Sequence, residues 1–305
     1  MADAAGVLAP FAEATVRIAT PLALAALGET VVERAGVINI GIEGAMLCGA
    51  LASAIAAGSS GSAVAGLLAG AVAGVAVALV FAIFTVRLKG DQIVVGTAIT
   101  LGATGLTGAV YRAAFGNTGA ALSLPTLPPL AVPGLASVPV VGRALFEQPL
   151  PTYLMYAAVP VLWLLFKRTQ YGLALRSAGE SPEAAAAAGL SVGRLRLMAL
   201  VIGGLMAGLA GATLVLAQAG TFAERMTAGR GFVAIAIVVL GRWNPAGVFG
   251  AALVFGAASA LQFSFQAAGV AVPYQFFLMA PYVLSLLTLA GIGGRARSPE
   301  ALGRA

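Results

Sequence analysis

Long apolar runs, separated by short polar breaks, follow one another along most of the chain. A helix needs about 20 mainly apolar residues to cross a bilayer. Runs of this kind lie near 14–30, 36–58, 62–86, 93–112, 150–166, 196–218, 229–241, 245–266 and 273–292. The run at 229–241 is short for a full crossing, and the run after Gly36 begins with polar residues. The pattern therefore predicts an all-α, polytopic transmembrane helix bundle with about 8–10 spans.

The composition narrows the class of protein further. Hydrophobic residues make up 60% of the 305 residues, whereas charged residues make up only 9%. A soluble domain usually carries about 25% charged residues, and the mean hydropathy of this chain is +0.99. A soluble enzyme and a nucleic-acid-binding protein are therefore excluded. The 40 glycines fit helices that pack closely in a membrane.

Residues that commonly carry chemistry are scarce. The chain has no histidine and a single cysteine, Cys48. An intrachain disulfide, a zinc site with the usual ligands and histidine-based acid–base catalysis are therefore excluded. The G-x-x-x-x-G-K-[ST] loop that cradles nucleotide phosphates is also absent from the sequence. We expect no catalytic site, cofactor or metal in this chain, and hence no enzyme.

The distribution of basic residues predicts which loops face the cytoplasm. Loops rich in Lys and Arg stay on the cytoplasmic side of a membrane protein. Segments 87–91 and 167–196 and the tail at 293–305 carry an excess of Lys and Arg, whereas 113–149 does not. The first three segments are therefore predicted to be cytoplasmic and 113–149 to be external.

A proline-rich segment divides the predicted bundle into two groups of helices. Proline lacks an N–H and has a fixed φ, so the prolines of 113–149 predict irregular, extended chain rather than another span. The chain then forms a single transmembrane domain. Its parts are an N-terminal helix group at 14–112, the external loop at 113–149, a C-terminal helix group at 150–292 and the tail at 293–305.

Both helix groups contain a glycine-interrupted segment followed by a run of small residues. The first is Asn39-Ile-Gly-Ile-Glu-Gly44, and the second is Leu240-Gly-Arg-Trp-Asn-Pro245. Paired broken helices in the two halves of a membrane protein indicate a transport site near the middle of the bilayer. The similarity leaves open whether the two halves form an inverted repeat.

Charged and polar residues cluster around the first of these breaks: Glu29, Glu33, Arg34, Asn39 and Glu43. A charge at the bilayer centre costs about 3 kcal/mol on insertion scales, so such residues usually face a cavity or a partner. For Glu29, Glu33 and Arg34 we favour a structural ion pair of Arg34 with Glu33 or Glu43. For Asn39 and Glu43 we favour a polar site on a solute pathway.

The fourth apolar run contains a row of threonines at Thr97, Thr100, Thr104 and Thr107. Their spacing of three and four residues places them on one helix face. Uncharged hydroxyls fit a pathway for a neutral polar solute. The alternative is that they bond to carbonyls of their own helix or hold helices together, and the pattern does not decide between the two.

A short isolated helix is predicted within the basic segment. Ser181 can cap its N-terminus, Pro182 fits its first position, and Glu183 fits the positive end of its dipole. Gly189 can end it. The helix is almost all alanine, about 10 Å long, and too short to be stable alone. It fits docking into a groove on another protein; the alternative is a surface loop with one helical turn.

Several segments resemble a known family of membrane proteins. Residues 28–44, GETVVERAGVINIGIEG, resemble the signature of the nucleoside/simple-sugar branch of bacterial ABC transporter permeases. This branch belongs to the wider branched-chain amino-acid and ribose permease family. Segment 179–196 is similar to the family's cytoplasmic coupling loop, and 204–212 and 231–241 resemble the two helices after it. The similarity extends from residue 16 to residue 292.

The resemblance implies a multi-pass permease subunit of an ABC importer in the bacterial cytoplasmic membrane, which moves nucleosides or related neutral, sugar-containing solutes. It implies three protein partners: a cytoplasmic ABC ATPase that hydrolyses ATP, an extracellular solute-binding lipoprotein, and a second permease chain, either a paralogue or another copy. The alternative is a self-sufficient secondary carrier or facilitator, which would have no use for the short helix.

Two sets of residues are thus expected to carry the function. The solute pathway is expected at Asn39, Glu43, Thr97, Thr100 and Thr104. The contact with the ATPase is expected at Gly179, Glu180, Ser181, Pro182, Glu183, Ala185, Ala186 and Gly189.

Overall fold

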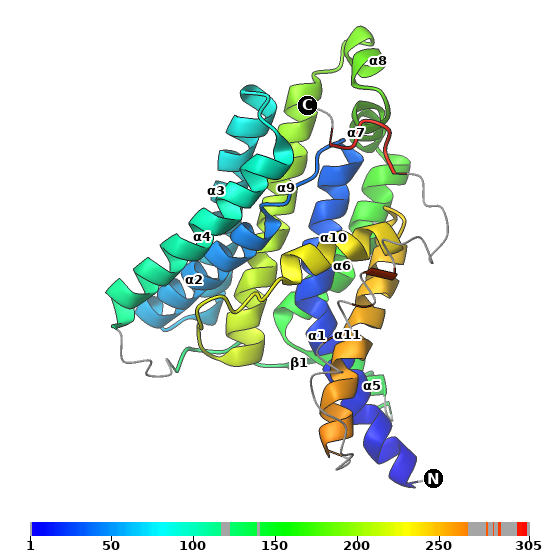
Figure 1. The fold of residues 1–305 in the computed structure, drawn as a ribbon. Helices are drawn as coiled ribbons and strands as arrows, with labels where there is room; N and C mark the ends of the chain where they lie inside the picture. Colours follow the sequence, from blue (N-terminus) through cyan, green and yellow to red (C-terminus); the bar gives the residue numbers. More distant parts are fainter. Residues whose placement is uncertain are drawn as a thin grey trace.

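The computed structural model describes residues 2–116, 123–138, 141–267 and 298–303, with four isolated positions between 268 and 297. Within these residues the chain is almost entirely helical, and most of its helices run side by side as one bundle (Figure 1). The predicted all-α, polytopic bundle is confirmed. The apolar run at 273–292 lies outside the described ranges.

Six helices in the described part of the chain are long and apolar enough to cross a membrane. They are α1 (Ala2–Arg34), α2 (Ile42–Ser60), α3 (Ala63–Ala82), α4 (Gln92–Phe115), α6 (Leu150–Arg168) and α9 (Val192–Thr213). Two of them continue into π-helical turns, α3 into η1 (Ile83–Arg87) and α9 into η2 (Leu214–Ala219). The remaining apolar helices are α10 (Arg230–Leu240) and α11 (Pro245–Ala267). As its sequence suggested, α10 is too short to cross, at about 16 Å.

Small residues let the central helices pack closely. Helix α9 packs against α1, α2 and α3, and α1 packs against α10 and α11 on another side. Gly49 of α2 and Gly70 and Gly74 of α3 all face Gly208 of α9, where an added Cβ would meet backbone atoms. Without side chains at the contact, van der Waals packing brings the helix backbones together in the membrane.

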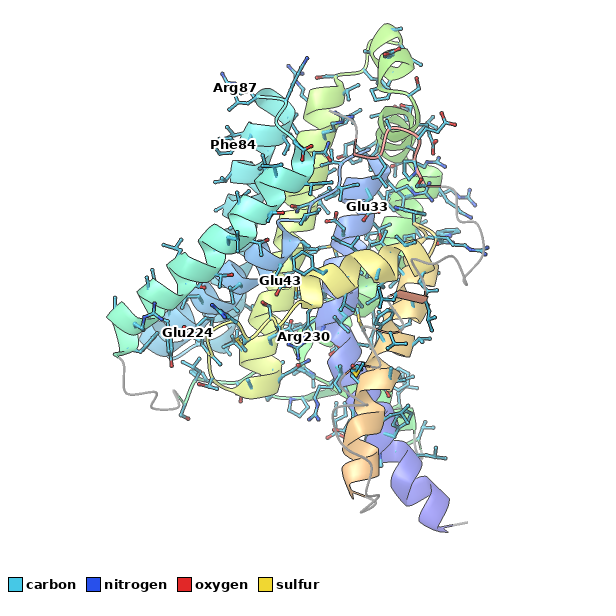
Figure 2. The ribbon with its side chains drawn as sticks, in the orientation of Figure 1. Glu33, Glu43, Phe84, Arg87, Glu224 and Arg230 are labelled. Carbon is cyan, nitrogen blue, oxygen red and sulfur yellow. The ribbon has the colours of Figure 1, made fainter. Side chains whose placement is uncertain are left out.

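The predicted cytoplasmic segments share one end of the bundle. Helices α7 (Gln170–Glu180) and α8 (Pro182–Ala187) lie there, as does Arg87 at the end of η1 (Figures 1 and 2). The tail returns to the same end, where Ala301 N donates to Gly179 O at 2.9 Å.

The proline-rich segment lies at the opposite end of the bundle, as does the N-terminus (Figure 1). It is more regular than predicted: it contains a short helix, α5 (Val141–Phe146), and two antiparallel strands, β1 (Leu130–Ala131) and β2 (Glu147–Gln148). Leu124 N and Leu127 N bond to carbonyls at the end of α9 and η2, namely Gly220 O and Leu216 O. Proline excludes a long helix here, but it does not prevent these short elements from forming around the bends.

The connection between α1 and α2 enters the bundle instead of forming a surface turn. Gly36 lies against Gly179, whereas Ile38 N donates to Gln92 Oε1 at 2.8 Å and Thr100 Oγ1 donates to Ile40 O at 3.3 Å. From Gln92 to Thr100, α4 rises about 12 Å. Helix α2 therefore begins well inside the bundle, six residues after the start of the predicted run at 36–58.

Candidate functional site

Glu43 joins the beginnings of two helices in the middle of the bundle (Figure 2). It lies in the first turn of α2 and is 7% exposed. Its Oε1 accepts hydrogen bonds from Thr227 Oγ1 at 2.6 Å and Gly229 N at 2.8 Å, and its Oε2 accepts one from Gly231 N at 2.6 Å. The carboxylate thus satisfies amides at the N-terminus of α10, which have no partner inside that helix and attract negative charge.

The backbone of Gly231 makes this contact possible. An added Cβ at Gly231 would lie 2.7 Å from Glu43 Cα and Glu43 N. The two helix starts can approach this closely only because position 231 has no side chain. Glu43 therefore fixes where α10 begins within the bundle.

Two buried carboxylates of α1, those of Glu29 and Glu33, bond to the two breaks that the sequence analysis paired. Glu29 Oε1 accepts from Asn39 N at 2.9 Å, in the break before α2. Glu33 Oε2 accepts from Trp243 Nε1, in the turn between α10 and α11. The chain is non-helical at residues 35–41 and 241–244, so the second break is where it was predicted, whereas the first lies a few residues earlier than predicted because α2 already begins at Ile42. One helical turn of α1 therefore anchors both of them.

The favoured ion pair of Arg34 is not formed. Arg34 Nε instead donates to Trp243 O at 3.0 Å. Salt bridges between described residues join Arg112 to Glu224 and Arg143 to Glu147, at the other end of the bundle, and none joins Arg34 to Glu33 or Glu43. Glu33 and Glu43 instead accept hydrogen bonds from α10 and from the residues on either side of it. These donors are too distant in the sequence to be predicted as partners.

Three buried oxygens near the first break have no hydrogen-bond partner among the described residues. They are Glu29 Oε2, Glu33 Oε1 and Asn39 Oδ1. Buried polar atoms are paired in more than about 90% of cases, and an unpaired one costs stability. An arrangement that packing alone would not favour is typical of a functional site.

The threonine row is graded in exposure. Thr97 is exposed, Thr100 and Thr104 are half-buried, and Thr107 is buried. Thr97, Thr104 and Thr107 donate to carbonyls of their own helix at 2.7–2.8 Å, as the structural alternative expected. Thr100 alone reaches across to Ile40 in the first break. Each hydroxyl that donates in this way can still accept a hydrogen bond.

The short helix in the basic segment forms where the sequence placed it. Ser181 Oγ accepts from Ala184 N at 3.4 Å, Pro182 is the first residue of α8, and Gly189 has a φ of +83°. The helix projects beyond the ends of the spanning helices (Figure 1). Glu183 and Ala186 are exposed, whereas Ala185 is buried, and residues of α7 and α8 line an apolar cleft.

Thr227, Gly229, Gly231 and Trp243 were not singled out as site residues from the sequence. They supply the donors to Glu43 and Glu33 from about 180 to 210 positions away along the chain. No periodicity marks them. The only available signal was the break at 240–245, which contains a glycine and an Asn-Pro pair. This pattern predicts a helix break but not a hydrogen-bond donor to Glu33.

Known proteins resemble this chain over nearly its whole length. A putative glucose ABC transporter permease protein, TsgC13 of Haloferax volcanii, is 38% identical over 300 residues, covering 93% of this chain and 88% of that protein. The guanosine ABC transporter permease protein NupQ of Bacillus subtilis is 36% identical over 310 residues, covering 99% and 97%. The nucleoside ABC transporter permease protein NupC of Lactococcus lactis is 35% identical over 293 residues, covering 93% and 92%.

A match to a protein family agrees with these relatives. Residues 11–289 match the model of the permease component of branched-chain amino acid transport systems. The match includes both breaks, the threonine row and α8. The chain therefore belongs to the family of branched-chain amino acid transport system permease components.

Proposed function

We propose that the chain is the membrane-spanning subunit of an ABC importer for nucleosides or related neutral, sugar-containing solutes, driven by ATP hydrolysis on a separate subunit in the bacterial cytoplasmic membrane. The relatives named for guanosine, nucleoside and glucose transport support this solute class. The observation that carries the proposal is α8: an exposed, capped helix of small residues beyond the spanning helices. A self-sufficient carrier or facilitator has no use for such an element.

The partners follow from this role. An ABC ATPase docks at α8 through the exposed residues Glu180, Ser181, Glu183, Ala186 and Gly189, whereas Gly179, Pro182 and Ala185 are buried or half-buried and hold the helix in place. A second permease chain and an extracellular solute-binding lipoprotein complete the importer. The outer face of α4 is open to a second chain, since its large apolar side chains Ile93, Val94, Leu101 and Leu106 are 57–69% exposed.

The solute pathway is proposed along Asn39, Glu43, Thr97, Thr100 and Thr104. Asn39 brings an unpaired buried oxygen, and the three threonines bring acceptors on a face that becomes more open from Thr104 to Thr97. Glu43 contributes by holding the start of α10 beside this path, since three donors already occupy its carboxylate. Hydrogen-bonding groups without a net positive charge fit a neutral solute.

The test is uptake of radiolabelled guanosine by the assembled importer in proteoliposomes. Asn39→Ala should lower uptake at least tenfold while the importer assembles and binds ATP. Thr107→Val is the matched control, because Thr107 is buried and bonds to its own helix. Normal uptake by Asn39→Ala would place the pathway elsewhere. Guanosine uptake by this chain alone, without ATP, would favour the facilitator.

A further inference from the structure

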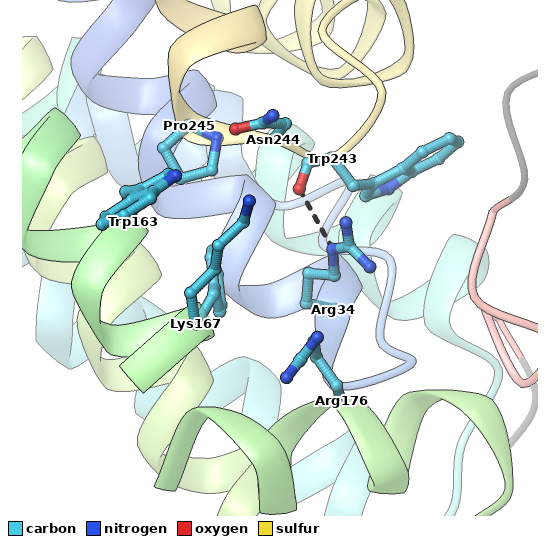
Figure 3. Close-up of a pocket in the computed structure, with 8 residues that line it drawn as sticks. Arg34, Trp163, Lys167, Arg176, Trp243, Asn244 and Pro245 are labelled. Carbon is cyan, nitrogen blue, oxygen red and sulfur yellow. Dashed lines mark hydrogen bonds between the residues drawn. The ribbon is translucent and has the colours of Figure 1, made fainter. Parts of the chain in front are cut away.

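A small basic cleft lies where four elements meet: the end of α1, the end of α6, α7, and the turn between α10 and α11 (Figure 3). Its lining includes Arg34, Trp163, Lys167, Arg176, Trp243 and Asn244. It is separate from the threonine row and from the exposed surface of α8. None of the residues proposed for the solute pathway lines it.

Three cations from three different helices surround this cleft. Arg34, Lys167 and Arg176 form no salt bridge with any carboxylate in the part of the chain that the structure describes. Arg34 and Arg176 each use Nε for a backbone carbonyl, Trp243 O at 3.0 Å and Gly172 O at 3.4 Å. Their terminal guanidinium nitrogens have no acceptor among the described residues and can hold an anion.

The charge of the cleft is unbalanced. Arg34 lies within electrostatic range of Arg176, which repels it, and of Glu180, which attracts it without forming a salt bridge. Glu180 is exposed and lines the separate cleft between α7 and α8. Like charges held together in a partly buried place are stabilised by a bound anion.

The position of the cleft indicates a membrane surface. Trp243 lines the cleft from its buried side, with its Nε1 bonded to Glu33, whereas Trp163 is half-buried near the end of a spanning helix. Tryptophan is enriched where a membrane protein passes from lipid to water. Lys167 lies in the last turn of α6, with its Nζ 5.3 Å from the centre of the Trp163 ring, so its ammonium stays at the end of a spanning helix. The basic residues around the cleft place it on the predicted cytoplasmic side.

We propose that this cleft binds the phosphate group of an anionic phospholipid in the cytoplasmic leaflet. The guanidinium groups of Arg34 and Arg176 provide paired N–H donors that match phosphate oxygens, and Lys167 adds a mobile positive charge. Asn244 Oδ1 accepts from Ala246 N, which leaves its amide N–H groups as further donors at the rim. Basic pockets between spanning helices recognise lipid headgroups in this way.

The bound lipid would bridge parts of the chain that must keep their relative positions. Arg34 directly follows Glu33 in the last turn of α1, and Lys167 lies in the last turn of α6. Arg176 lies in α7, which leads into α8. One phosphate held by all three would join the end of the spanning helices to α7. The expected consequence is a more stable α7 in membranes that contain anionic lipid.

The proposal can be tested with the full chain purified in detergent. Binding of phosphatidylglycerol and of zwitterionic phosphatidylcholine is titrated by native mass spectrometry, with inorganic phosphate as a separate arm. The variants are Lys167→Gln, Arg176→Gln and the two combined. Arg168→Gln is the matched control, because Arg168 follows Lys167 in the same helix, is exposed, and does not line the cleft. Size-exclusion profiles show whether each variant is folded.

We expect wild type to prefer phosphatidylglycerol, and each of the two charges removed to weaken that binding about fivefold. Arg168→Gln should remain within about twofold of wild type, because surface charges outside the cleft contribute little. Lys167→Arg should retain binding, and the single variants keep the test decisive if the double variant does not accumulate.

Three results would overturn the proposal. The first is phosphatidylglycerol binding that is unchanged in both single variants. The second is inorganic phosphate that binds wild type at the cleft while phosphatidylglycerol does not, which would identify a soluble anion as the ligand. The third is unchanged lipid binding with lost ATPase co-purification, which would assign the cleft to an acidic segment of the ATPase.

Discussion

Glu43 and helix α8 each interrupt the apolar runs of the chain. The residues that satisfy them lie at very different distances along the sequence. The ends of α8 are satisfied within a few residues, by Ser181 at its start and by Gly189 after its last turn. Glu43 is satisfied by Thr227, Gly229 and Gly231, which are more than 180 positions away. The first kind of interruption is local and exposed, whereas the second is buried and depends on the whole bundle.

This difference separates two kinds of functional element. Another protein can bind an exposed helix of small residues without any change inside the bundle. A buried carboxylate that starts two helices cannot be altered without disturbing both. Substitutions at Glu43 should therefore affect folding before function, and substitutions on the outer face of α8 should affect function alone.

The largest effect is expected for Glu43→Ala. It leaves Gly229 N, Gly231 N and the Thr227 hydroxyl buried without an acceptor, and each such group costs about 1–3 kcal/mol. We expect folded, monodisperse protein to be almost absent from membranes, as measured by fluorescence size-exclusion chromatography.

The control is Glu43→Gln, which retains one carbonyl oxygen as an acceptor and should accumulate to an intermediate level. Normal accumulation of Glu43→Ala would show that α10 does not depend on this carboxylate and would remove the contrast with α8.

The next effect concerns the two neighbouring alanines of α8. Ala186 is exposed, so Ala186→Arg should leave the fold intact but clash with a docked ATPase and lower guanosine uptake at least tenfold. Ala185 is 3% exposed, so Ala185→Arg should disturb α8 itself. Uptake, co-purification with the ATPase and proteolysis of the 179–190 segment distinguish the two.

An intact α8 and full ATPase co-purification in Ala186→Arg would contradict docking at this helix. Substituting Arg at Ala187, which is also exposed, tests whether the outer face as a whole makes the contact.

A smaller effect is expected at the second break. Trp243→Phe keeps a six-membered aromatic ring but removes the five-membered ring with the Nε1 donor of Glu33 Oε2. A hydrogen bond contributes about 0.5–1.5 kcal/mol and the lost ring volume adds to this, so we expect a lower thermal midpoint with a correctly assembled bundle. The second substitution Glu33→Gln should add little to Trp243→Phe if the two side chains act through one bond. Fully additive losses would show that Glu33 is stabilised by other groups.

The smallest effect is expected for the exposed salt bridge between Arg112 and Glu224 at the opposite end. Their side chains are 50% and 42% exposed, although the N–O distance is 2.7 Å. Exposed pairs contribute about 0–1 kcal/mol and are screened by salt. Arg112→Ala should shift the thermal midpoint only slightly, and the shift should vanish in high salt. A shift as large as that of Trp243→Phe would mean that burial does not explain the ranking.

The sequence predicted much of this architecture because membrane helices leave strong local signals. Apolar runs marked the spans, the shortness of α10 was visible in its run, and Ser181, Pro182 and Gly189 marked α8 within a residue at each end. The glycine content also indicated close helix packing, which α3 and α9 show. The regular structure around β1 and α5 was not predicted, since a two-residue strand has no pattern of its own.

The candidate site was predicted only in part. Glu29, Glu33, Asn39 and Glu43 were recognised as unusual because charge is costly in a bilayer. Their partners were not, and the ion pair with Arg34 was wrong. The relation of the two helix groups by inversion and the role of the threonine row stay predictions.

The sequence by itself determined that the chain is a polytopic helix bundle with a capped, exposed helix in its basic segment, because hydrophobic length and helix capping act between residues close in the chain. Only the tertiary structure decided that one turn of α1 holds both breaks, that Glu43 starts α10, and that three cations and both tryptophans meet in one cleft. Hydrogen bonds and charges depend on distances in space, and residues about 200 positions apart acquire those distances only when the helices pack.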